Sequence, residues 1–92
     1  MSDVVFIPYL RRLSLEDLEM VVEGLGRAIR SLQVSASPNY TSDAAAALLE
    51  TRILQLQGEM MLVAQEALRR HPKNEHEEEV RTRILQANQL LE

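Results

Sequence analysis

The stretch from Asp43 to Arg70 constrains the fold more strongly than any other part of the chain. It contains no proline, and its apolar residues recur at alternating steps of four and three, which is typical of one long helix. One line of apolar residues along this helix consists of Leu49, Ile53, Leu56, Met60, Val63 and Ala67. A second line, turned by roughly a quarter of a circle at about 100° per residue, consists of Leu54, Met61 and Leu68.

The two lines make about half of the helix circumference apolar, whereas a helix on a single neighbour needs an apolar stripe only a little over about 100° wide. We therefore expect this helix to contact two partners. These are either two other helices of the same chain, or one of them and another molecule. Leu48 and Leu62 fall on the otherwise polar side and add weight to a contact outside the hairpin.

A second helix is predicted before the long one. Ser14, with Asp17 three residues later, is a typical N-terminal capping pattern, and a matching apolar seam follows over about residues 15–33. Gly24 and Gly26 interrupt this seam, and each costs about 1 kcal/mol relative to alanine inside a helix. Three explanations are open: another backbone approaches closely at these glycines, the helix bends locally, or the helix simply tolerates them.

A third, shorter helix is predicted over about residues 75–91. Pro72 ends the long helix, and Asn74 with Glu77 forms a capping pattern for the next one. The stretch 33–42 is rich in Ser, Pro and Asn and predicts a loop, so the two long helices should form an antiparallel hairpin. Four carboxylates precede an arginine by four residues and should pair with it along a helix: Glu23 with Arg27, Glu66 with Arg70, Glu77 with Arg81, and Glu79 with Arg83.

Residues 1–13 form a separate apolar segment. Its β-branched and aromatic residues favour extended backbone, and Pro8 disfavours the helical region at the residue before it, so we expect an extended arm with at most one helical turn at 8–12. The arm either folds back over the helices of its own chain or docks on another molecule. The resulting architecture is all-α: a single domain, residues 1–92, with a long antiparallel helical hairpin, a shorter third helix and an extended apolar N-terminal arm.

Composition excludes several kinds of chemistry. The chain has no cysteine, so disulfides, thiolate nucleophiles and cysteine zinc sites are excluded. A net charge of −4 argues against nucleic-acid binding, which depends on cationic side chains. His76 and Glu79 are spaced to face one ion, but no second cluster completes a coordination shell. We expect no metal, no cofactor and no catalytic residues, and hence a protein that is not an enzyme.

The order of residues at the N-terminus is not that of a signal peptide, because Asp3 precedes the apolar run and the arginines follow it. No stretch approaches the roughly 20 apolar residues that span a bilayer. We therefore expect a cytoplasmic protein without a membrane partner. A chain of 92 residues has a thin margin of stability, so self-association would help it.

These features predict a non-catalytic protein–protein interaction module: an adaptor, co-chaperone or assembly subunit that binds a partner helix, or itself as a homodimer, through an apolar helix face. The alternative is a small regulatory protein of the antitoxin or transcription-factor type. The residues predicted to contact the partner are Phe6, Ile7, Tyr9, Leu10, Leu48, Leu54, Met61, Leu62 and Leu68.

Overall fold

The computed structural model describes the backbone of residues 3–37 and 41–90, and the side chains of residues 8–37 and 41–88. This part of the chain forms the helices α1 (Asp3–Arg12), α2 (Leu15–Ser35), α3 (Asp43–Arg69) and α4 (Glu75–Leu90). The prediction of an all-α fold built on a helical hairpin is confirmed. The predicted long helix is α3, which ends one residue earlier than expected.

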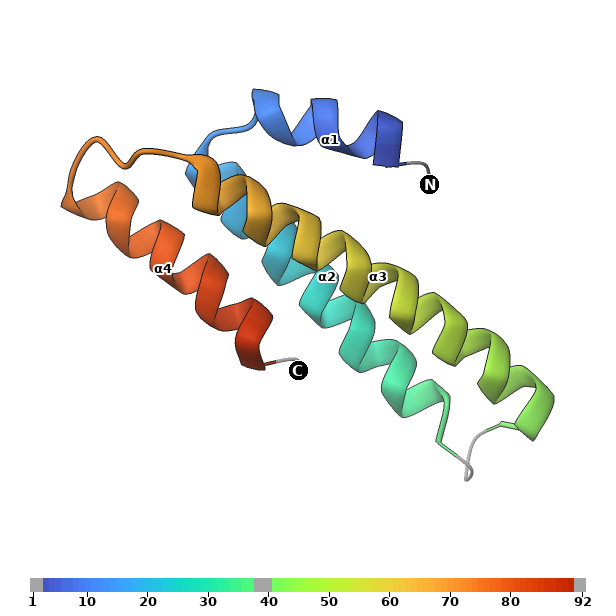
Figure 1. Cartoon of the computed structure of the whole chain (residues 1–92). Coiled ribbons are helices and arrows are strands. Elements are labelled where there is room, and N and C mark those ends of the chain that lie inside the picture. Colours follow the sequence, from blue (N-terminus) through green and yellow to red (C-terminus); the bar gives the residue numbers. More distant parts are fainter. Residues whose placement is uncertain (1–2, 38–40, 91–92) are drawn as a thin grey trace.

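The hairpin of α2 and α3 forms the long axis of the molecule, which measures 49 × 26 × 17 Å. The helix α4 packs against both members of the hairpin, whereas α1 contacts α3 (Figure 1). Both α1 and α4 lie at the end of the hairpin where α2 begins and α3 ends (Figure 1). At the opposite end, the described residues of α2 and α3 have no third helix beside them.

The core lies where α2, α3 and α4 meet. Its buried side chains come mainly from the apolar seams that the heptad spacing predicts, and each contributes about 1.5–3 kcal/mol when fully removed from water. The buried cluster consists of Leu10, Leu15, Leu18, Val22, Ile29, Ile53, Leu56, Met60, Val63, Ala67, Val80 and Ile84. The hairpin is therefore held together by aliphatic packing along matched seams.

Side-chain caps mark where three of the helices begin. The hydroxyl of Ser14 accepts a hydrogen bond of 3.1 Å from the backbone N–H three residues later, and the hydroxyl of Ser42 accepts one of 3.3 Å in the same way. Before α4, the side-chain oxygen of Asn74 accepts one of 2.9 Å. Each cap satisfies an N–H group that has no acceptor inside its own helix, so the predicted starts of α2 and α4 are confirmed.

The N-terminal segment is helical, so the prediction of an extended arm is wrong. Pro8 is in the second turn of α1, where its missing N–H removes one internal hydrogen bond, the one to the carbonyl four residues earlier. The preference of β-branched residues for extended backbone is weak, on the order of 1 kcal/mol, and tertiary contacts can override it. One such contact comes from Leu10, which is buried in the core, so α1 packs on its own chain.

The glycines of α2 are not sites of close backbone approach. A Cβ added to Gly24 would meet only the end of the Arg27 side chain, at 3.9 Å, and one added to Gly26 would meet only the end of Arg30, at 3.6 Å. No backbone atom of a neighbouring helix lies within 4 Å of either added Cβ. The helix therefore tolerates these glycines without a packing requirement for them.

Replacing Gly24 with alanine should raise the free energy of unfolding by about 0.5–1 kcal/mol, because alanine restricts the unfolded chain and meets no obstacle in the folded helix. Urea unfolding followed by circular dichroism measures the difference. A loss of stability in Gly24→Ala would contradict this assignment, because it would require a close contact at Gly24.

Candidate partner-binding surface

The outward side of α3 carries three apolar side chains that no helix of the described part covers. Leu54 is 68% exposed, Met61 is 50% exposed and Leu68 is 54% exposed. The three lie seven residues apart and so form one line along the helix. Exposed apolar surface that is continuous along one element is typical of a binding surface, whereas single exposed residues are ordinary.

Two neighbouring methionines show how strictly the helix separates its two faces. Met60 is 1% exposed and belongs to the core, whereas Met61 is 50% exposed. The residues are of the same type, and a helix turns by about 100° between one residue and the next. The exposure of Met61 is therefore set by which face of α3 it occupies, with the neighbouring helices packed on the other side.

The middle of this outward face is hollowed around Gly58. A Cβ added to this glycine would meet nothing within 4 Å, so the helix backbone itself forms the floor. Apolar walls are provided by Leu54, Met61 and Leu62, and polar side chains stand around them. The full lining is Arg52, Leu54, Gln55, Gly58, Glu59, Met61, Leu62 and Gln65. An apolar centre inside a polar rim is the usual composition of a protein–protein contact.

Three further residues of the predicted surface lie beside this hollow or on α1. Leu48 is 75% exposed, on the half of α3 that neither α1 nor α4 flanks. Leu62 is partly buried and packs against the core cluster, so only part of its side chain is available to a partner. Tyr9 is 64% exposed on α1. The predicted residues thus divide between α3, which provides a continuous line, and α1, which provides Tyr9.

Leu10 does not belong to the exposed surface, because its side chain is 3% exposed and packs in the core. Its assignment to the partner-binding surface is therefore corrected: in this conformation Leu10 attaches α1 to the hairpin. The side chains of Phe6 and Ile7 lie outside the described residues, although both belong to the backbone of α1.

A buried ion pair fixes the end of α1 to α3. The guanidinium of Arg70 donates from Nε to the carboxylate of Glu66, at 2.6 Å, and from Nη2 to the backbone carbonyl of Leu10, at 2.9 Å. Glu66 is only 7% exposed, so its charge requires a partner. Spacing along the chain predicts the pair of Glu66 and Arg70. No local sequence signal predicts that Arg70 also donates a hydrogen bond to the carbonyl of Leu10, 60 residues away.

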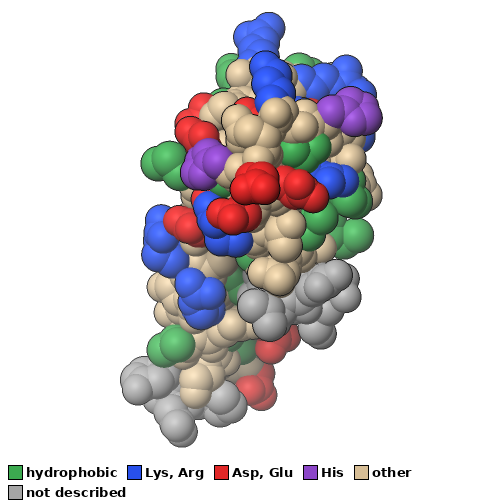
Figure 2. Space-filling model, turned by 90° about the vertical axis from the view of Figure 1, so that its left-hand side faces the viewer, with side chains coloured by type: hydrophobic (Ala, Val, Ile, Leu, Met, Phe, Trp, Pro, Cys, Tyr) green, Lys and Arg blue, Asp and Glu red, His purple; other side chains and the backbone are tan. Residues whose placement is uncertain are grey.

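The beginning of α4 is attached to α2 and α3 through charged side chains. Figure 2 views this end of the molecule and shows acidic, basic and histidine side chains intermixed over it. Arg83 donates to both carboxylate oxygens of Glu19, and this hydrogen bonding raises the pKa of Arg83 above its ordinary value. Nε2 of His76 lies 3.3 Å from the carboxylate of Glu16. These contacts join α4 to α2.

Arg81 caps the C-terminal end of α3. It donates to the backbone carbonyl of Ala67 at 3.1 Å and to that of Leu68 at 3.4 Å, and no hydrogen bond joins it to the predicted partner, Glu77. The last carbonyls of a helix have no internal donor, and a cation there also complements the helix dipole. The predicted pairs of Arg81 and Arg83 within α4 are thus replaced by contacts with other helices.

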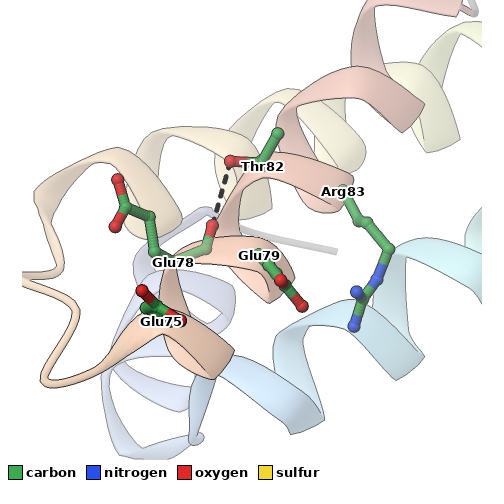
Figure 3. Close-up of a pocket in the computed structure, with 5 residues that line it drawn as sticks. All are labelled: Glu75, Glu78, Glu79, Thr82 and Arg83. Atoms are coloured by element: carbon green, nitrogen blue, oxygen red, sulfur yellow. Dashed lines mark hydrogen bonds between the residues drawn. The ribbon is translucent and has the colours of Figure 1, made fainter.

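An open depression lies on α4 near its first turns. It is lined by Glu75, Glu78, Glu79, Thr82 and Arg83, and the hydroxyl of Thr82 donates to the Glu78 carbonyl at 2.9 Å (Figure 3). Across the described residues, no group of three or more His, Cys, Asp or Glu side chains could hold a metal ion. His76, the histidine of the hypothetical metal pair with Glu79, instead contacts Glu16.

No protein-family model, no curated protein and no solved structure matches this chain. The surface is therefore interpreted from its own geometry. Among the helices of the described residues, none combines the length and the apolar character needed to cross a membrane.

Removing the Arg70 side chain should release α1 from α3. In Arg70→Met, the buried Glu66 carboxylate loses its main hydrogen-bond partner, and the free energy of unfolding should fall by about 1.5–3 kcal/mol. Hydrogen exchange should show faster exchange of the α1 amides, with α2 and α3 much less affected. The matched control is Arg69→Met, because Arg69 is 62% exposed and approaches Glu66 only at 3.8 Å. Equal effects of the two substitutions would contradict this assignment.

Proposed function

We propose that this protein is a non-catalytic protein–protein interaction module that binds an amphipathic helix of another molecule, or of a second copy, on the outward face of α3. An adaptor, a co-chaperone and an assembly subunit all work in this way. The observation that carries the proposal is the line of Leu54, Met61 and Leu68, exposed along a helix whose opposite face is fully packed.

Burial of this line contributes favourably to the free energy of association. Complete burial of one leucine or methionine side chain contributes about 1.5–3 kcal/mol, and each of these three has half or more of its surface still in water. Covering the line therefore supplies several kcal/mol toward the cost of association, which lies in the range of about 4–15 kcal/mol. The hollow at Gly58 adds close packing for a bulky side chain of the partner.

The polar groups support binding rather than catalysis. The charged pairs of Arg70 with Glu66 and of Arg83 with Glu19 join helices to one another, and His76 is placed against Glu16 in the same way. We propose the cytoplasm as the compartment in which the module acts, because a chain without cysteine gains nothing from oxidising surroundings.

Affinity capture with the full chain tests this proposal. Leu54→Glu should reduce the amount of bound partner, or of bound second copy, at least about tenfold, since a tenfold change corresponds to about 1.4 kcal/mol and the lost burial exceeds it. The fold should be retained, because Leu54 is 68% exposed.

Met20→Glu is the matched control, because Met20 is equally exposed, at 67%, but lies on α2. It should bind as the unchanged protein does. The proposal is contradicted if Leu54→Glu captures as much as the unchanged protein, or if both substitutions weaken capture equally.

A further inference from the structure

The outward face of α3 is a second heptad seam that runs the length of the helix. Its positions follow steps of three and four residues, and every one of them is exposed. The buried line from Ile53 to Ala67 on the other side of α3, called the inner seam below, has the same spacing. The outer seam begins at Ala44 and Ala47 in the first turns. It continues through Thr51, Leu54, Gly58, Met61, Gln65 and Leu68. Five of its eight positions are apolar, and Thr51, Gly58 and Gln65 stand between the large apolar residues. The line therefore has the spacing, with a partly apolar composition, of a helix that packs lengthwise on another helix.

We propose that the occupant of the outer seam is a second copy of this chain, whose α3 lies antiparallel to the first. This inference rests on the proposed function and specifies its partner. Small side chains, Ala44, Ala47 and Thr51, occupy the first three positions of the seam. After them the large residues Leu54, Met61 and Leu68 are separated by Gly58 and Gln65. An antiparallel copy lays large residues on small ones. A parallel copy would leave gaps at one end and crowd the other.

One antiparallel register gives every position of the outer seam a counterpart, with Gln65 beside Ala47. The side chain of Leu54 enters the open space at Gly58 of the second copy, and the same contact occurs in reverse. In this register Met61 faces Thr51 of the second copy, and Leu68 faces Ala44. Each contact is made twice because a twofold interface uses the same surface on both subunits.

The flanks of the outer seam agree with this register. Leu48 and Leu62 lie on the same edge of the seam, and the register brings Leu48 of one copy beside Leu62 of the other. Leu48 is the most exposed large apolar residue of the described side chains, at 75%, so the dimer gives it an apolar neighbour. A partly buried leucine and a fully exposed one thereby cover each other.

Charge favours the same orientation. Asp43 lies in the acidic first turn of α3 and Arg69 in its basic last turn. Antiparallel packing sets the Asp43 end of one copy beside the Arg69 end of the other and opposes the two helix dipoles, whereas parallel packing sets like charges together. Arg69 is 62% exposed and makes only a 3.8 Å contact with Glu66, so its side chain is available.

The neighbours of α3 are unevenly distributed along its length. The half of α3 near Arg69 has α1 and α4 beside it, while the half near Asp43 is accompanied only by α2 (Figure 1). In an antiparallel dimer, the half of α3 that has only α2 beside it lies over the half of the other copy's α3 that also has α1 and α4 beside it.

Cysteine crosslinking tests the register directly, because the natural chain has no cysteine. Oxidation of Thr51→Cys/Met61→Cys should give a covalent dimer. The two thiols stand about 15 Å apart along one helix at 1.5 Å per residue, so they cannot join within a chain. Thr51→Cys alone should not crosslink, since antiparallel packing separates the two copies of that position. Efficient crosslinking of Thr51→Cys alone, or none in the double variant, would overturn the proposal.

Sedimentation of the full chain tests the dimer without modification. The unchanged protein should show a mass that rises from one copy to two with concentration, and Gly58→Arg should remain a single copy. A Cβ added at Gly58 meets nothing within 4 Å and the position is exposed, so this variant should fold. Ser31→Arg, with the same added charge at an exposed position of α2, should dimerise normally.

The two proposals can fail separately. A single copy at every concentration, together with capture of a different protein that Leu54→Glu abolishes, would overturn the second copy as occupant and leave the interaction module standing. A dimer that Gly58→Arg does not weaken would also overturn the proposed interface.

Discussion

The structure depends on the burial of one face of α3. Its inner seam, from Ile53 to Ala67, packs against α2 and α4 and supplies about half of the buried core. Each of the other three helices of the described part contacts α3. The helices α2 and α4 pack against it, and α1 is attached to its end through Leu10 and Arg70. The helix α3 has apolar residues on two sides, and packing within the chain buries only one of them. The outward side is therefore left uncovered.

Polar contacts complement this packing by fixing the ends of the helices. Arg70 holds the end of α1, Arg81 caps the last carbonyls of α3, and Arg83 joins α4 to α2. None of these arginines belongs to the outer seam. The chain therefore uses charge to orient its own helices and keeps the middle of the α3 surface apolar, with polar groups at its rim. A surface of that composition is suited to specific binding of a helix.

The sequence predicts much of this fold because the information is local. Heptad spacing, the caps Ser14 and Asn74, and Pro72 determine where the long helices lie. The sequence also predicts that α3 has more apolar surface than one neighbour covers, and Leu54, Met61 and Leu68 are exposed as that excess requires. The interpretation of α1 as extended fails because its conformation depends on contacts made 60 residues away, which no short-range pattern records. The same reason explains why Leu10 is in the core.

The adjacent methionines of α3 provide the most direct test of the central claim, that the outward face of this helix binds a second copy of the chain. Methyl NMR of labelled methionine reports on both at once. The account predicts that the Met61 signal shifts as the protein concentration rises, while the buried Met60 and the α2 residue Met20 keep their positions. A Met61 signal that stays unchanged over the whole concentration range, or a Met60 signal that moves equally, would contradict it.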